Sequence, residues 1–186
     1  MNVYTFVMMG ISSLWFLSEV MINILTRSKK AEAKSHDQHS VSVLWIVIML
    51  SIAGGVVNAF HYSQFGLVSY CSGMALMVIG ITIRFLAIFS LKTYFNANVS
   101  IHYDHRLKTD GMYRLVRHPS YTGSLLTFLG LGVSLGNWVS LLIIFMPVLC
   151  VFLYRINLEE KVLKQNFKQV YLDYQKRTKR LIPFIY

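Results

Sequence analysis

Long apolar blocks constrain this chain more than any other feature. Four of them fill most of the 186 residues: Val3–Leu25, Val41–Phe60, Leu67–Leu91 and Ser124–Tyr154. A helix needs about 20 consecutive apolar residues to cross a bilayer, and the first three blocks each have that length. Only 14% of the residues are charged, whereas soluble domains have about 25%. The pattern predicts an all-α integral membrane protein.

The fourth block is long enough for one tilted span, but its middle favours a turn. Gly136-Asn137 is a turn signal, and two further glycines, Gly130 and Gly132, precede it. We therefore expect a tight hairpin of two short helices and about five transmembrane helices in total. Residues 1–91 then form a three-helix membrane region, and residues 92–186 form the functional region with a catalytic layer on the cytoplasmic side.

Charge predicts how the spans are oriented. Lys and Arg are frequent after the first and third blocks and from Arg155 onward, whereas the loop His61–Gly66 has neither. The positive-inside rule places the N-terminus outside and the C-terminus in the cytoplasm, which requires an odd number of spans. The net charge of +10 then comes from cytoplasmic loops that face anionic lipid. The sequence contains no separate basic domain, so nucleic-acid binding is not expected.

Cysteine and histidine spacing predicts no metal site and no disulfide. Cys71 and Cys150 both lie inside apolar blocks, and neither has a second ligand at metal-binding spacing. His102 and His105 have a His-x-x-His spacing, but no cysteine or carboxylate accompanies them at a matching distance.

Two charged residues lie inside predicted spans. Glu19 is expected to have a structural role, either paired or reaching the interface. Arg84 lies about two turns from the cytoplasmic end of its span, so it either extends to the interface or points into a polar cavity.

The C-terminal region mixes several patterns. Asn96–Ile101 is short and β-like, and apolar residues from Leu158 to Tyr174 recur at the helical period, which predicts an amphipathic helix. Thr178–Tyr186 is predicted to be extended because Pro183 disfavours helix. Its apolar residues need burial, so we expect the tail to form a strap over the catalytic layer; they are Leu181, Ile182, Phe184 and Ile185.

Charged and aromatic residues cluster at both ends of the last apolar block. Arg117–Gly123 precedes it, and Pro119 is well placed in the first turn of the helix that follows. His118 then lies at a helix N-terminus, where free N–H groups favour a carboxylate. If the block is a hairpin, its two ends meet in one pocket of six residues: Arg117, His118, Tyr121, Arg155, Glu159 and Glu160. An ordinary i,i+4 ion pair is the alternative for Arg155 and Glu159.

Three segments together resemble the isoprenylcysteine carboxyl methyltransferase family, in particular its compact prokaryotic members. They are Thr109–Gly123, the pair Glu159-Glu160, and Arg180–Ile185, and the resemblance covers about residues 92–186. It implies transfer of a methyl group from S-adenosyl-L-methionine to the carboxylate of a C-terminal prenylcysteine or a similar lipid-linked carboxylate, with S-adenosylhomocysteine as product. The partners would be a lipid-modified cysteine or protein C-terminus and membrane lipid.

The family motif and the hairpin together nominate site residues. Seven are expected to bind the cofactor: Tyr113, Leu115, Val116, His118, Tyr121, Glu159 and Glu160. Arg155 is expected to hold the acceptor carboxylate, with Glu159 orienting its guanidinium, and Arg117 is the competing candidate. A carboxylate is already ionised at neutral pH, so the reaction needs no general base.

Other functions compete with this interpretation. A phospholipid or amine N-methyltransferase needs a base, for which His118 is available. An NADPH-dependent sterol-type reductase needs a basic phosphate-binding cluster, which Lys176, Arg177, Lys179 and Arg180 resemble. A non-enzymatic scaffold leaves the Arg117–Gly123 cluster unexplained. For a lipid substrate we expect lateral entry, with room left by Gly123, Gly130 and Gly132 unless these glycines serve helix packing.

Overall fold

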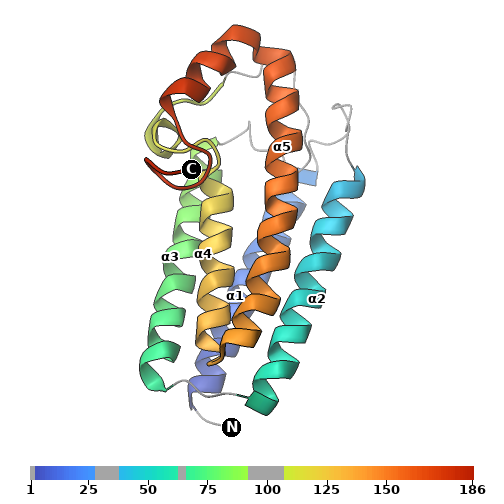
Figure 1. Cartoon of the computed structure of the whole chain (residues 1–186), viewed down its shortest axis with the longest axis vertical. Coiled ribbons are helices and arrows are strands. Elements are labelled where there is room, and N and C mark those ends of the chain that lie inside the picture. The colour runs from blue at the N-terminus through green and yellow to red at the C-terminus, as the bar shows by residue number, and fades with distance from the viewer. Residues whose placement is uncertain (1–2, 28–37, 63–65, 92–106) are drawn as a thin grey trace.

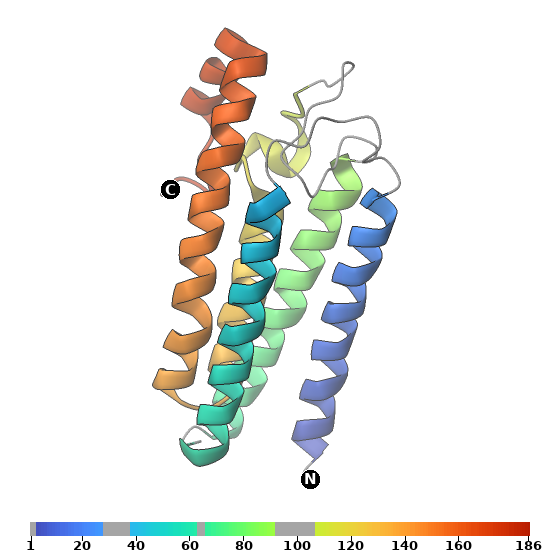
Figure 2. The same cartoon turned by 90° about the vertical axis from the view of Figure 1, so that its right-hand side faces the viewer.

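The computed structural model describes residues 3–27, 38–62, 66–91 and 107–186. These residues form the helices α1 (Val3–Arg27), α2 (Gln38–Tyr62), α3 (Leu67–Leu91), α4 (Pro119–Ser134) and α5 (Trp138–Arg177), and the short 3₁₀ helix η3 (Gly111–Arg114). The long helices stand side by side in a bundle, and α5 extends beyond the others at one end (Figures 1 and 2). The predicted β-like segment Asn96–Ile101 and the pair His102 and His105 lie outside the described residues.

Within the described residues, three helices are long and apolar enough to cross a membrane. They are α2 from Val41, α3 and α5. In α1 the described apolar part is Gly10–Ile22, and α4 has 16 residues. Both are shorter than a full span, which needs about 20 residues. The protein is therefore a helical integral membrane protein throughout most of its described residues, and the count of five spans stays a prediction.

The predicted turn of the hairpin is present between α4 and α5. Gly136 has a φ of +81°, a left-handed conformation that glycine adopts without steric cost. Asn137 then caps α5, because its side chain accepts a hydrogen bond from the backbone N–H of Ser140 at 2.7 Å. These two residues reverse the chain and bring the start of α4 back beside the middle of α5.

The second helix of the hairpin is much longer than predicted. It runs for 40 residues and contains both the apolar span and the segment that the sequence predicted as a separate amphipathic helix. No glycine or proline separates these segments, so the helix continues out of the apolar region. Its path breaks only at Lys168, whose φ of 45° and ψ of −121° are not helical. The final turns therefore fold back toward the bundle (Figure 1).

Helices α3 and α4 are packed backbone against backbone. A Cβ atom on Gly80 would lie 2.5 Å from the carbonyl oxygen of Gly123, and one on Gly130 would lie 2.5 Å from that of Gly73. Gly132 is similarly closed by Leu141, at 2.6 Å. These glycines bring helices into close contact, which is a common packing mode in membranes. The structure thus supports packing, and not room for a lipid chain, as their role.

Replacing Gly130 with leucine should destabilise the protein by about 3 kcal/mol or more, at the upper end of the range for overpacked cores. The two nearest atoms are backbone atoms of α3, which cannot rotate away. Thermal or denaturant unfolding in detergent measures the effect. Gly10→Leu is the matched control, because a Cβ on Gly10 meets nothing within 4 Å. Equal losses for both variants would contradict the packing argument.

Candidate functional site at one end of the bundle

The ends of α4 and α5 meet the C-terminal tail in a compact set of charged residues. We call residues 111–118, 155–160 and 171–181 the polar layer. η3 is the first segment of this layer. His118, just before Pro119, has the non-helical φ of −125° that a residue preceding proline favours. Pro119 then begins α4, as the sequence predicts.

The tail lies alongside the segment that leads into α4. The backbone N–H of Arg117 donates to the carbonyl of Lys179 at 2.7 Å, and that of His118 donates to the carbonyl of Arg180 at 3.1 Å. Val116 and Lys179 form a parallel β-bridge. Of the tail that was predicted to form a strap, Lys179 and Arg180 pair with the segment that leads into α4. The segment is held by backbone pairing, which sequence periodicity does not reveal.

The tail differs from the prediction beyond Arg180. Residues 181–186 form a turn and not an extended strand, with the N–H of Leu181 bonded to the carbonyl of Tyr186 at 2.7 Å. Only Leu181 is buried, with 5% of its surface exposed. The expected burial of Ile182, Phe184 and Ile185 is wrong, because the turn directs these side chains away from the protein.

Glu160 is the charged centre of the polar layer. Its side chain is buried, and its two oxygens accept from Arg117 Nε and Arg180 Nη2, each at 2.9 Å. His118 Nε2 lies 3.5 Å from Glu160 Oε1. Burial raises the pKa of Glu160, but His118 and Arg117 outweigh it and bring the pKa down to about 2. Glu160 lies beyond the apolar part of α5 and is ionised at every physiological pH.

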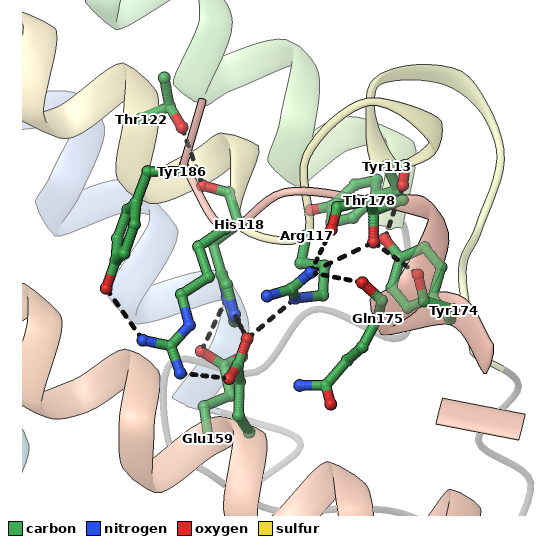
Figure 3. A network of polar contacts seen from close by, with 11 residues as sticks. Tyr113, Arg117, His118, Thr122, Glu159, Tyr174, Gln175, Thr178 and Tyr186 are labelled. Carbon is green, nitrogen blue, oxygen red and sulfur yellow. Dashed lines mark hydrogen bonds and ion pairs between the residues drawn. The ribbon is translucent and has the colours of Figure 1, made fainter. Parts of the chain in front are cut away.

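Arg117 is used to hold the tail. Besides Glu160, its Nη1 donates to the carbonyl of Gln175 at 3.3 Å and to that of Thr178. These carbonyls belong to the end of α5, where helix carbonyls have no intrahelical partner. Tyr174 adds a further link, since its hydroxyl donates to the carbonyl of Tyr113 at 2.6 Å (Figure 3). The contacts of Arg117 fit the anchoring role that competes with a catalytic one.

Glu159 differs from its neighbour Glu160. Its Oε2 faces His118, 3.6 Å from Nδ1 (Figure 3), and among the described residues this oxygen has no hydrogen-bond partner. His118 Nε2 also has no hydrogen-bond partner among the described residues, and the side chain of His118 is only 4% exposed. Buried polar atoms without partners are rare in native proteins and call for an explanation such as a bound ligand. The hydroxyl of Tyr171, in the same layer, also has no hydrogen-bond partner among the described residues. The pair of His118 and Glu159 brings an acidic and a basic group together and so marks a part of the layer that has binding capacity left.

Arg155 lies at the inner edge of the layer. It is 4% exposed, and its Nε donates to the hydroxyl of Tyr121 at 3.4 Å. Tyr121 stacks at a tilt on His118, with ring centroids 5.8 Å apart. The hairpin therefore brings Arg155, Tyr121 and His118 together, and the pairing of Arg155 with Glu159 stays a prediction. Of the other nominated residues, Tyr113 and Val116 are buried, and Leu115 is 50% exposed.

The hydrogen-bond partners of Arg84 were not predicted from the sequence. Its guanidinium forms a two-point ion pair with Glu19 of α1, with Nη2 2.7 Å from Oε2, so it points to polar partners inside the bundle. Its Nη1 also donates to Ser124 Oγ at 2.7 Å and Ser120 Oγ at 3.0 Å. The paired role expected for Glu19 is confirmed. A charged residue inside a span was the available signal.

The fold and the site define a helical membrane protein with a buried charged layer at one end of its bundle. The model of the isoprenylcysteine carboxyl methyltransferase family matches residues 73–165, half of the chain. The chain belongs to this family.

Individual relatives agree with this assignment. Protein-S-isoprenylcysteine O-methyltransferase A of Arabidopsis thaliana is 33% identical over 147 residues, which are 78% of this chain and 71% of that protein. A probable protein-S-isoprenylcysteine O-methyltransferase of Oryza sativa subsp. indica is 36% identical over 66% of this chain and 64% of that protein.

A solved structure shares the fold. The eukaryotic intramembrane Ras methyltransferase, an isoprenylcysteine carboxyl methyltransferase, superposes with a TM-score of 0.69 and 26% identity, covering 96% of this chain and 65% of that one. The chain thus spans less than two thirds of the length of the rice relative and of this structure.

Proposed function

We propose that this protein transfers a methyl group from S-adenosylmethionine to the carboxylate of a prenylated C-terminal cysteine or a similar lipid-linked carboxylate. The observation that carries the proposal is the pair of buried, unsatisfied atoms on His118 and Glu159, next to the buried Arg155. Acidic and basic groups are thus held side by side where the apolar helices end. Such a position serves a water-soluble cofactor and a membrane-bound acceptor together.

The residues present fit a cationic cofactor. S-adenosylmethionine, when bound, supplies a methyl group on a positively charged sulfur. Glu160 is already engaged by two arginines, so Glu159 Oε2 is the oxygen available for the amino group of the cofactor. His118 Nε2 is the nearby ring atom that remains to be satisfied. Glu160 then acts through the residues it holds, namely Arg117, Arg180 and His118.

Arg155 is the residue that we assign to the acceptor. An arginine presents a planar fork that matches a carboxylate at two points, and the reaction depends on aligning that carboxylate with the methyl group. The carboxylate is ionised and needs no base, so the chain has to position it and exclude water from it. Burial of Arg155 beside Tyr121 supports both tasks.

The residues of the polar layer fit the two rival enzyme classes less well. The basic cluster that a reductase would need is partly used inside the protein, because Arg180 pairs with Glu160 and Lys176 pairs with Asp173. An N-methyltransferase remains the second candidate, since His118 between two carboxylates resembles a general base. A scaffold would give no reason for leaving a buried atom of Glu159 and one of His118 without hydrogen-bond partners.

Purified protein in lipid nanodiscs should methylate a farnesylated cysteine analogue from labelled S-adenosylmethionine. The label should be released by alkali, because a carboxyl methyl ester hydrolyses whereas an N-methyl group does not. An analogue with a C-terminal amide is the matched control and should accept no label. Alkali-stable label on phosphatidylethanolamine, with none on the cysteine analogue, would replace the proposal by N-methyl transfer.

The polar layer is proposed to face the cytoplasm, with the acceptor entering laterally from the bilayer. A cysteine placed at Tyr62, at the far end of α2, should react with an impermeant maleimide added outside intact cells. A cysteine at Arg177 should react only after permeabilisation. Both variants need a background in which Cys71 and Cys150 are serine. The reverse labelling pattern would invert the topology.

A further inference from the structure

The C-terminal turn, residues 181–186, displays apolar side chains that the protein itself does not cover. Ile182 is 49% exposed, Phe184 is 86% exposed and Ile185 is 74% exposed. Phe184 also has a φ of +67°, the left-handed region in which a bulky side chain is unfavourable and glycine is preferred. A phenylalanine in this conformation, facing outward, contributes little to the packing of the chain. Its side chain therefore points to an external partner.

The turn is held in a defined conformation by hydrogen bonds. The N–H groups of Leu181 and Ile182 both donate to the carbonyl of Tyr186 at 2.7 Å, and the N–H of Tyr186 donates to the carbonyl of Ile182 at 3.1 Å. Arg180, which pairs with Glu160, also donates to the hydroxyl of Tyr186 at 2.9 Å. The orientation of the exposed side chains is thus coupled to the polar layer.

The position of the turn identifies the partner. Thr122, in the first turn of α4, donates to the carbonyl of Leu181 at 2.7 Å. The C-terminus accordingly lies beside the upper end of α3 and α4 in Figure 1, level with the end of these apolar helices and below the tip of α5. Arg177 and Lys179, which lead into the turn, are exposed. Apolar residues next to basic ones, at this depth, match the boundary between acyl chains and anionic headgroups.

We propose that the C-terminal turn inserts Phe184 and Ile185 into the lipid interface and so anchors the polar layer to the membrane. The turn lies beside the ends of the apolar helices α3 and α4, so the bilayer can cover its exposed side chains without a second protein. Through Arg180 and Glu160 the anchor holds the tail against Arg117. This role goes beyond the proposed methyl transfer and does not depend on it.

The test measures the depth of single labelled residues. Phe184→Cys and, separately, Ile185→Cys are labelled with an environment-sensitive NBD dye in a background with Cys71→Ser and Cys150→Ser. Each is reconstituted at one copy per nanodisc, with lipids brominated near the headgroup end of their acyl chains. Gln165→Cys, on the exposed face of α5 beyond the apolar segment, is the control. Size-exclusion profiles and unfolding midpoints confirm that each variant is folded.

Both tail labels should emit at shorter wavelength and be quenched several-fold more strongly than the label at position 165. Phe184→Gly, which relieves the left-handed conformation, should leave the unfolding midpoint in detergent unchanged or higher and reduce quenching at position 185. Quenching equal to the control at both tail positions would overturn the proposal. Shielding of the dye that arises only with two copies per disc would assign the surface to a second chain instead.

Discussion

Replacing Glu160 with alanine should destabilise the protein by about 3–5 kcal/mol, the range for breaking a buried ion pair. The variant leaves Arg117 and Arg180 without their shared carboxylate, and both hold the tail in place. Binding of S-adenosylhomocysteine should fall with it, because His118 loses a neighbour on one side. Denaturant unfolding in detergent and calorimetric titration of S-adenosylhomocysteine measure the two effects.

Glu159→Ala is the matched control for this prediction, because it removes the adjacent carboxylate from the same helix. Its Oε2 makes no hydrogen bond among the described residues, so its loss should leave stability nearly unchanged and still weaken S-adenosylhomocysteine binding. His118→Ala should also weaken binding. A Glu160→Ala protein as stable as the parent, or equal stability losses for both glutamates, would contradict the division of roles.

Replacing Arg155 with lysine should lower turnover by about 100-fold while S-adenosylhomocysteine still binds. Lysine keeps the charge but lacks the planar fork that grips a carboxylate at two points. Losing such a buried, charge-assisted contact costs about 2–5 kcal/mol, and each 1.36 kcal/mol corresponds to about a tenfold change in rate. Single-turnover methylation of the farnesylated cysteine analogue measures the chemical step apart from product release.

Arg117→Lys separates the two candidate arginines. Its guanidinium contacts Glu160 and the carbonyls at the end of α5, so we expect reduced stability together with reduced activity. Arg155→Lys should instead leave the unfolding midpoint close to that of the parent. If Arg155→Lys retains near-native methylation while Arg117→Lys is stable and inactive, Arg117 holds the acceptor and the assignments must be exchanged.

The buried pair of Glu19 and Arg84 shows what hydropathy alone misses. The sequence places both residues in apolar blocks, 65 positions apart. From the sequence, each charged side chain could also have reached the membrane interface separately. In the folded protein they neutralise one another between α1 and α3, and two serines of α4 complete the set. Whether the two residues pair or reach the interface depends on which helices are neighbours. The periodicity of a single helix does not reveal its neighbours.

The glycines make the same point for packing. Spacing places Gly73 and Gly80 on one face of α3, and Gly123 and Gly130 on one face of α4. Only the assembled bundle shows that these faces meet, with backbone atoms filling the space where a Cβ would lie. Room for a lipid chain and close helix contact are both compatible with the sequence, and the distance between the helices decides between them.

The sequence by itself determined the features that depend on local composition. Apolar length predicted the membrane helices, Gly136-Asn137 predicted the hairpin turn, and that turn brought Arg117, His118 and Arg155 to one end. The different roles of Glu159 and Glu160, the folded-back tail and the exposure of Phe184 were decided by tertiary structure. Identical adjacent carboxylates differ only in what surrounds them, and a tail without helical or strand periodicity takes its shape from the surface on which it packs.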